Sequence, residues 1–340
     1  MGLEREEIDG LDGLRQLRPA WLALWRRCPD ATPFQHPDWL VAYCEPFRVE
    51  QPWCLALWRD GQLVGLVPLV VYARGGERVA TLLGAGISDY QDALLEPGVR
   101  TAALDAVFDW LAGARERWDV LELEHLVATS PLAGCWLPSE WRADLRSMDV
   151  CPVLRLPATV DQLAGVISPH LADNLRYARR RAERLGSLQY ETATAATLEA
   201  LLEDLVRLHR QRWSSRGEMG MLSPPMEAFH RCVARAFLEA GLLRLHAVRL
   251  DGQVIAVYYG FAAHRRAYYY LGGWDPAVAR LSPGTLAVSY AIEAAIRAGN
   301  QEFDFLRGGE AYKYAWGARD RPTYTRSLVY SPARALEHAD

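Results

Sequence analysis

The residues best suited to proton transfer lie in the stretch DFLRGGEAYKYAW near the C-terminal end of the chain. Asp304, Arg307, Glu310 and Lys313 follow one another there at a spacing of three residues. A carboxylate can act as a general base, and a cation can stabilise a developing oxyanion. The alternative is a structural ladder of salt bridges along a helix, which the two intervening glycines disfavour.

A second pair of carboxylates lies in the glycine-containing loop GAGISDYQD, at Asp89 and Asp92. They suit recognition of a cationic acceptor, and the alternative is an ordinary pair of turn-forming aspartates. His209 and Trp213 lie four residues apart on the helical pattern LVRLHRQRW, so they share one face. We expect His209 either to line one cleft together with these two carboxylates or to be a structural histidine.

The stretch ARLSPGTL has the features of an anion site at the start of a helix. Ser282 is a favourable N-cap, Pro283 suits the first turn, and Gly284 lets another molecule approach the backbone. Free amide groups and the helix dipole attract phosphate at such a start. Arg280 and Thr285 flank it, and the alternative is a capped helix without a ligand.

Two pairs of similar segments indicate an internal duplication. CLALWRDGQLVGLVPLVV from Cys54 matches LHAVRLDGQVIAVYYGF from Leu245, and each predicts a hairpin with a type I′ turn at Asp-Gly. The segments that begin LEPG at Leu95 and LSPG at Leu281 each predict a helix followed by a strand. Both pairs have nearly the same separation along the chain, so each half should repeat one order of elements.

A chain of 340 residues is longer than the roughly 250 to 300 residues at which single cores divide, so we expect two domains, 1–156 and 157–340. Each should be of the α/β class, a mixed and mostly antiparallel sheet flanked by helices. Pro68 suits an edge or bulged position in its strand. The strands expected in the second half are 243–250, 254–262, 266–272, 301–306 and 323–330, and the helices are 170–185, 196–215, 225–240 and 284–298.

Composition excludes several classes of protein. The net charge of -4 gives no global attraction to nucleic acid or anionic membranes. The acidic start has no signal-peptide pattern, and no apolar run of about 18 residues occurs, so we expect a cytoplasmic protein without membrane insertion. The six cysteines form no CxxC pair, which predicts neither zinc nor disulfides. Arg176, Arg180 and Arg184 form a helical stripe, either a solvated face or a contact for the phosphate groups of a ligand or of an RNA backbone.

The order of hairpin, strand, glycine-containing turn, helix and strand resembles the GNAT acyltransferase core, and two tandem GNAT-like domains resemble the Fem-type aminoacyl transferases. The resemblance is most specific to the CelD-type acetyltransferase group and covers nearly the whole chain. The helix start departs from the usual Q/R-x-x-G-x-G/A turn, because its glycine comes one place late. The motifs that carry the resemblance are SDYQDALL, NLRYARRRAERLG, LHRQRW, GGWDP, SPGTL and FDFLRGGEAYKYAW.

This resemblance implies an acyltransferase whose second domain binds acyl-CoA, most plausibly acetyl-CoA, and whose first domain receives the acceptor. An amine acceptor arrives protonated, so we expect Asp304 to hold it and Glu310 to deprotonate it. Similarity to the Fem-type enzymes implies that Lys313 stabilises the oxyanion. Asp89, Asp92 and His209 complete the expected catalytic set. The expected cofactor residues are Arg280, Ser282, Gly284, Thr285 and Tyr270, with no metal.

The expected function is transfer of an acyl group from acyl-CoA to an amine of a small molecule or sugar by a monomer or homodimer. One alternative keeps the fold and uses aminoacyl-tRNA as the donor, forming an amide. Another is a non-catalytic GNAT-fold binding protein in envelope polysaccharide or natural-product assembly.

Overall fold

The computed structural model describes residues 2–49, 51–214 and 220–331, and it divides into two compact units. The second unit is Val150–Arg321, and the first consists of the chain before it together with the segment that starts at Pro322. The predicted division into 1–156 and 157–340 differs from this at both ends, because the last strand returns to the first unit. The end of that predicted second domain, 332–340, lies outside the described residues.

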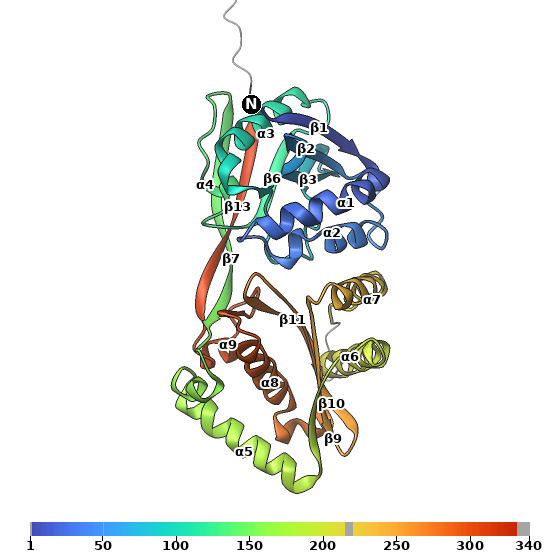
Figure 1. Cartoon of the computed structure of the whole chain (residues 1–340), viewed down its shortest axis with the longest axis vertical. Coiled ribbons are helices and arrows are strands. Elements are labelled where there is room, and N and C mark those ends of the chain that lie inside the picture. The colour runs from blue at the N-terminus through green and yellow to red at the C-terminus, as the bar shows by residue number, and fades with distance from the viewer. Residues whose placement is uncertain (1, 50, 215–219, 332–340) are drawn as a thin grey trace, which may run out of the picture. The chain divides into compact units, whose positions relative to one another are not determined.

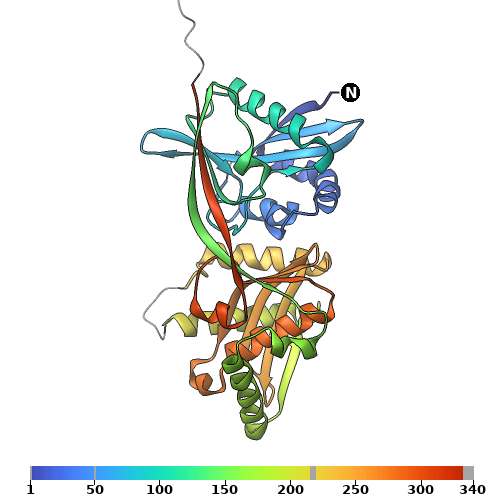
Figure 2. The same ribbon diagram turned by 90° about the vertical axis from the view of Figure 1, so that its left-hand side faces the viewer.

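The first unit contains a sheet with the strand order β1-β2-β3-β4-β6-β13-β7, where β13 lies beside β7 (Figure 2). Helices α1 and α2 cover one face of this sheet and α3 covers the other (Figure 1). The elements are β1 (Glu4–Asp9), α1 (Gly10–Arg27), η1 (Pro33–Gln35), α2 (Pro37–Cys44), β2 (Trp53–Arg59), β3 (Gln62–Arg74), β4 (Glu77–Leu82), β5 (Leu94–Leu95), η2 (Pro97–Val99), α3 (Arg100–Gly113), β6 (Val120–Val127), α4 (Pro131–Gly134), the first part of β7 (Trp141–Arg155) and most of β13 (Arg319–Tyr330).

The second unit contains the strand order β12-β11-β10-β9-β8, and the end of β7 pairs with β12. Helices α6 and α7 cover one face, and α8 covers the other with α5 packed on it (Figure 1). The elements are η3 (Val160–Gly165), α5 (Pro169–Leu185), β8 (Leu188–Thr192), α6 (Leu198–Ser214), α7 (Pro224–Glu239), β9 (Leu243–Leu250), β10 (Gln253–Ala263), β11 (Arg266–Trp274), η4 (Pro276–Leu281), α8 (Pro283–Arg297), β12 (Glu302–Asp304) and α9 (Ala311–Ala315).

The predicted hairpins and their turns are confirmed. Asp60 and Gly61 join β2 to β3, and Asp251 and Gly252 join β9 to β10. All four have positive φ, between 49° and 80°, which is the signature of a type I′ turn. In each unit the strand after the hairpin is followed by a helix and then by a parallel partner strand, β4 with β6 and β11 with β12. The α/β fold of two tandem GNAT-like domains follows from this repeat.

Two sequence expectations meet a different arrangement. The strand expected at 323–330 in the second half belongs to β13, which pairs antiparallel with β6 of the first unit. Pro68 lies inside β3, between the residues that pair with β4 and those that pair with β5. At Pro68 itself, neither β4 nor β5 pairs with β3, so no strand on that side lacks a hydrogen bond because proline has no N–H group. The proline is therefore tolerated without an edge or a bulge at its position. The last residue of the helix expected at 196–215 lies outside the described residues.

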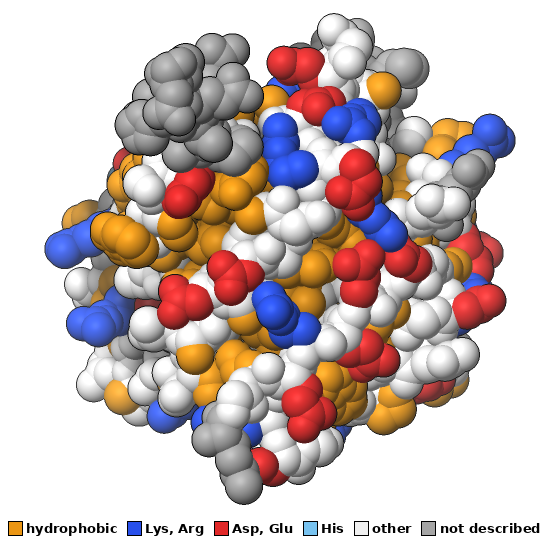
Figure 3. Space-filling view, turned by 90° about the horizontal axis from the view of Figure 1, so that it is seen from above, with side chains coloured by type: hydrophobic (Ala, Val, Ile, Leu, Met, Phe, Trp, Pro, Cys, Tyr) orange, Lys and Arg blue, Asp and Glu red, His pale blue; other side chains and the backbone are white. Residues whose placement is uncertain are grey.

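Two further features are the distribution of charge on the surface and the polarity of the helices. On the face seen in Figure 3, acidic and basic side chains are interspersed and neither sign gathers into a patch. Every helix within the described ranges is too short or too polar to cross a membrane.

Candidate active site

The candidate site is built around β11 in the second unit. Its parallel pairing with β12 ends at Tyr268 and Asp304, and β11 then continues to Trp274. The opposite edge keeps its antiparallel pairing with β10 to the same end. From Tyr269 to Trp274, therefore, β11 has one edge that no strand of the described chain pairs with. Peptide groups on that edge have no strand partner in the described chain.

A bulge in β11 decides which tyrosine points to the sheet face that α8 covers. The register with β10 passes from Leu271 to Tyr269, so Tyr270 is the extra residue. Tyr269 stacks on Tyr258, with ring centroids 4.8 Å apart, on the face covered by α8. Tyr270 instead contacts His230 of α7, at 5.1 Å between ring centroids. The expected cofactor residue Tyr270 therefore lies on the opposite face, and Tyr269 takes the place beside α8.

The start of α8 is the helix start expected to bind an anion, and one of its features differs from the expectation. Ser282 occupies the N-cap position with φ 51° and ψ 49°, and its side chain makes no capping hydrogen bond. A side-chain N-cap needs extended backbone angles, so this part of the expectation is wrong. The Leu286 amide bonds the Ser282 carbonyl at 3.1 Å, which leaves the amides of Gly284 and Thr285 without intrahelical acceptors. Arg280 is exposed and has no ion-pair partner among the described residues.

Trp274 connects the end of β11 to this helix start. A Cβ atom added to Gly284 would lie 3.0 Å from Trp274 Cδ1, so the indole packs against the first turn of α8. The guanidinium carbon of Arg212, on α6, lies 6.0 Å from the centroid of the same indole. The last part of β11 thus brings together residues from α6 and from the start of α8.

Two tyrosines and a glutamate interact at the open edge of β11. Burial raises the pKa of Tyr269, while Arg212 lowers it and Glu310 raises it. Burial also raises the pKa of Tyr312, and the charges of Tyr269 and Glu310 add to this effect, although Tyr312 exposes 44% of its surface. Both phenols therefore stay protonated at neutral pH and can donate a proton.

Lys313 has a structural position that the sequence did not reveal. It is the only lysine in the chain, and only 2% of it is exposed. Its Nζ donates to the carbonyl oxygens of Leu306, Arg307 and Gly308, at 3.1, 2.7 and 2.9 Å. All three ammonium protons are engaged, and Glu310 Oε2 lies 2.8 Å away as the counter-ion. The expected flexible exit after β12 is therefore a closed turn, and Lys313 has no proton left for an oxyanion.

Glu310 is the residue of the predicted set that remains available for chemistry. It occupies the N-cap position of α9, and its side chain is 58% exposed. Its described partner is Lys313, which contacts one carboxylate oxygen. The other oxygen has no partner among the described residues, and the charge of Glu310 acts on the pKa values of Tyr269 and Tyr312.

Asp304 is fully buried, and both of its carboxylate oxygens have partners. Oδ1 accepts from the Leu306 amide at 2.8 Å, and Oδ2 accepts from Arg321 Nη1 at 3.2 Å. Leu306 has φ 57°, so this carboxylate holds a strained turn in place. Asp304 thus supports the turn that carries Glu310, and the acceptor-binding role expected for it has no free oxygen.

His209 lies where α6 approaches β11 most closely. A Cβ atom added to Gly273 would be 2.5 Å from the His209 amide nitrogen, so only glycine fits there. His209 Nδ1 lies 3.3 Å from the Gly272 carbonyl oxygen, whereas its buried Nε2 has no hydrogen-bond partner among the described residues. Burial lowers its pKa, so the ring is neutral at pH 7 and can bond a neutral ligand group.

The first-unit pair, Asp89 and Asp92, lies in a tightly held loop. Trp39 Nε1 donates to Ser88 Oγ at 3.0 Å, and Gln35 Nε2 donates to the Tyr90 carbonyl at 2.9 Å. Asp89 is buried, with 7% exposed. Asp92 accepts from the Ala93 amide at 2.8 Å, and desolvation raises its pKa to about 7.

Asp92→Asn is expected to stabilise the protein above about pH 7 and to leave stability nearly unchanged near pH 4. The folded-state pKa of Asp92 is raised, so wild-type stability is full below the ordinary aspartate pKa and falls as pH rises toward about 7. Each unit of pKa shift is worth about 1.4 kcal/mol, so the effect is of the order of 4 kcal/mol. Thermal unfolding across this pH range, with the exposed Asp105→Asn as the matched control, measures it. Equal pH profiles for wild type and Asp92→Asn would refute it.

The arginines of α5 do not act as one group. Arg176 forms an ion pair with Asp173, and Arg179 bonds Ser289 Oγ of α8 at 2.7 Å. Arg180 and Arg184 are exposed and have no ion-pair partner among the described residues.

The sequence analysis missed Arg212 and Tyr269 as site residues. The three consecutive tyrosines of AYYYLGGW cannot be told apart from the sequence pattern. Only the bulge decides which face of the sheet each one points to. Arg212 lies one turn after His209 on α6, a spacing that could have placed it at the same site.

Known proteins resemble this chain in part of its sequence and in its fold. Residues 170–314 match the family model described as "Acetyltransferase (GNAT) domain". The crystal structure of FemX has a TM-score of 0.67 and 12% identity, covering 91% of this chain and 95% of its own. A search of curated proteins found no match.

Two further solved structures have TM-scores of 0.60 and 12% identity. One is the C-terminal domain (DUF2156) of a putative lysylphosphatidylglycerol synthetase from Agrobacterium fabrum, with 92% of each chain covered. The other is a conserved protein of unknown function from Bacteroides thetaiotaomicron, covering 94% of this chain and 97% of that one. Identities this low speak for the fold alone. Residues 170–314 are thus similar to the GNAT acetyltransferase domain, within a chain whose fold resembles that of FemX.

Proposed function

We propose that the protein is an N-acyltransferase that moves an acyl group from acyl-CoA, most plausibly acetyl-CoA, to an amine of a small molecule or sugar in the cytoplasm. The observation that carries the proposal is the start of α8, where the amides of Gly284 and Thr285 have no intrahelical acceptor. Arg280, which has no ion-pair partner among the described residues, precedes this helix by three residues. A pyrophosphate there accepts hydrogen bonds from both amides and pairs with the guanidinium. The acyl chain then runs along the open edge of β11.

The chemical step follows from the groups at that edge. The amine arrives as an ammonium ion, and Glu310 takes its proton. The amine nitrogen then attacks the thioester carbonyl carbon, forming a tetrahedral oxyanion. Because Lys313 has no free proton, amide groups of β11 beyond Tyr268 are the proposed oxyanion donors. The C–S bond breaks, Tyr312 gives its proton to the thiolate, and the phenolate takes the remaining extra proton from the former amine nitrogen to leave the neutral amide.

The remaining predicted residues take supporting roles in this proposal. His209 Nε2 bonds a polar group of the substrate, and Trp274 walls the donor. That Asp89 and Asp92 recognise the acceptor stays a prediction from the sequence. The CelD-type resemblance stays a prediction of the acceptor class.

Arg280→Gln is the direct test of the donor site. We expect the Kd for acetyl-CoA to rise about five- to tenfold, because a charged hydrogen bond to phosphate is lost. Arg280 is exposed and unpaired, so folding should be unchanged. Arg319→Gln, another exposed arginine of the same unit, is the matched control for calorimetric titration. Equal affinity of both variants for acetyl-CoA would contradict this site.

A second candidate function is transfer from aminoacyl-tRNA, as expected for a Fem-type enzyme. Arg180 and Arg184 on α5 favour it, because they are exposed and have no ion-pair partner among the described residues. Binding of charged tRNA that weakens steeply with salt, and that is lost in an Arg180→Gln, Arg184→Gln double variant, would favour it over acyl-CoA. Binding of either donor without any turnover would favour the non-catalytic alternative.

A further inference from the structure

The edge of β7 that faces away from β13 is open within the first unit. β12 pairs with β7 at residues 153–155, and backbone bonds from the segment after β12 reach back as far as the Val150 carbonyl. Over residues 141–149, therefore, no strand of the described chain pairs with this edge. Residues 142–148 are all exposed. This part of β7 presents a row of peptide groups to which another strand can bond.

The open edge carries charges of alternating sign. Successive side chains of a strand point to opposite faces, so Arg142, Asp144 and Arg146 share one face with Met148. Leu145, of which 48% is exposed, lies on the other face. Charges of one sign along an edge would repel a second copy of the same strand, because like charges directly opposite each other are destabilising. The alternating signs on β7 allow two copies to attract each other instead.

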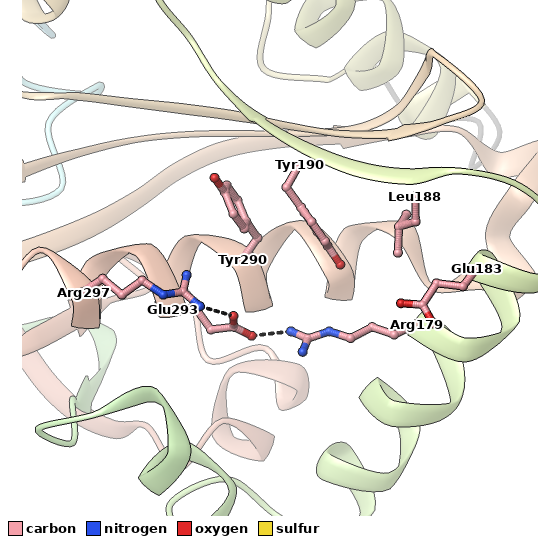
Figure 4. Close-up of a pocket in the computed structure, with 7 residues that line it drawn as sticks. All are labelled: Arg179, Glu183, Leu188, Tyr190, Tyr290, Glu293 and Arg297. Atoms are coloured by element: carbon pink, nitrogen blue, oxygen red, sulfur yellow. Dashed lines mark hydrogen bonds and ion pairs between the residues drawn. The ribbon is translucent and has the colours of Figure 1, made fainter.

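The ion pair on this edge does not hold the fold together. Arg146 Nε lies 2.7 Å from Asp144 Oδ2 on the same strand, and the two side chains are 67% and 62% exposed. Neither has another ion-pair partner among the described residues. The ion pairs of Glu293 in Figure 4 are different, because this carboxylate, only 13% exposed, joins Arg179 of α5 to Arg297 of α8. Asp144 and Arg146 join no two elements, so they can exchange partners without loosening the fold.

Two copies of this edge match in one antiparallel register. Residues directly opposite each other point to the same face, so a two-fold axis perpendicular to the sheet must pass between two copies of one residue. An axis at Asp144 or at Arg146 places like charges opposite each other. An axis at Leu145 places each Asp144 opposite Arg146 of the other copy and brings the two leucines together on the other face.

The length of the open edge selects the same register. Leu145 is the middle residue of 141–149, so an axis there pairs the whole open edge. An axis at Ala143 also sets opposite charges against each other, but it leaves only residues 141–145 of the open edge paired. The register centred on Leu145 therefore combines matched charges with the longest pairing.

We propose that two copies of this chain form a homodimer through the open edge of β7, antiparallel and with Leu145 of one copy opposite Leu145 of the other. The sheet of the first unit then continues from one copy into the next. The partner is the chain itself, because its own charge pattern complements the edge. The proposal selects the homodimer from the two oligomeric states expected from the sequence, and it does not rest on the proposed function.

Charge reversal on the edge tests the proposal, with sedimentation velocity of the full chain at a series of concentrations as the readout. We expect wild type to dimerise, and the dissociation constant of the dimer to rise about tenfold or more in Asp144→Arg and in Arg146→Asp, because each places like charges opposite each other. The double variant restores opposite signs and should dimerise as wild type does. Both side chains are exposed, so folding should be unchanged. Asp105→Arg, an exposed position on α3, is the matched control and should leave the dimer intact.

A mixture of the two single variants gives the sharpest readout. One variant has arginine at both positions and the other has aspartate at both, so each repels its own copies and complements the other variant. We expect a heterodimer in the mixture at concentrations where each variant alone is a monomer. Three outcomes would overturn the proposal: a wild type that stays monomeric at every concentration, a dimer that both single variants keep, or a mixture without heterodimer. None of these measurements depends on acyl transfer.

Discussion

Acyl transfer by Glu310→Gln is expected to be about 100 to 10,000 times slower than by the wild type, the range that general base catalysis contributes. The carboxylate of Glu310 has one oxygen paired with Lys313 and one available to the acceptor ammonium. Glutamine keeps the size of the side chain but cannot take the proton. Initial rates with acetyl-CoA and an accepted amine measure the effect, and the loss should appear in kcat.

The control for this variant is Glu239→Gln, an exposed glutamate on α7 of the same unit. It should keep the wild-type rate. Acetyl-CoA affinity should be unchanged in both variants, since Glu310 does not belong to the donor site. A Glu310→Gln enzyme with near-normal kcat would remove Glu310 from the mechanism and leave the proton with another group.

Lys313→Met is expected to lower the free energy of unfolding of the second unit by about 3 to 5 kcal/mol, because each buried carbonyl oxygen left without a donor costs about 1 to 3 kcal/mol. The substitution leaves three carbonyl oxygens, those of Leu306, Arg307 and Gly308, without their common donor. Thermal and urea unfolding measure the loss. Little change in stability would contradict the structural role assigned to Lys313.

Lys313→Arg separates charge from geometry at the same position. A planar guanidinium cannot direct its protons at three converging carbonyls as an ammonium can, so this variant should also be destabilised. The single lysine gives a second readout, because an amine-selective reagent can modify only Lys313 and the N-terminus. We expect Lys313 to resist modification in the folded wild type. Rapid modification of the native protein would contradict its burial.

Much of the fold could be predicted because its signals are local. The Asp-Gly pairs specify type I′ turns by their own backbone preferences, and the helix at 170–185 follows from its periodicity and appears as α5, Pro169–Leu185. The return of β13 to the first unit could not be predicted in this way. A strand pattern states which residues alternate, but it does not identify the partner strand.

Some features of the candidate site could likewise be predicted from the sequence, and others could not. The position of the α8 start followed from Pro283 and Gly284, whereas the left-handed angles of Ser282 depend on the preceding η4 turn. The stretch after β12 appeared flexible because of its two glycines. Its actual order comes from Lys313, which reaches back to three carbonyls, a contact that no local pattern encodes. A β-bulge likewise exchanged the faces of Tyr269 and Tyr270.

The measurement that tests the central claim most directly is calorimetric titration of acetyl-CoA and desulfo-CoA into wild type, Gly284→Ala and Gly284→Glu. Both variants bring a Cβ atom against Trp274, but only the glutamate places a negative charge at the helix start. We expect saturable binding of both ligands to wild type, binding that is retained in Gly284→Ala, and binding that is lost in Gly284→Glu. No binding to wild type, or equal binding to all three proteins, would contradict an acyl-CoA site at the start of α8.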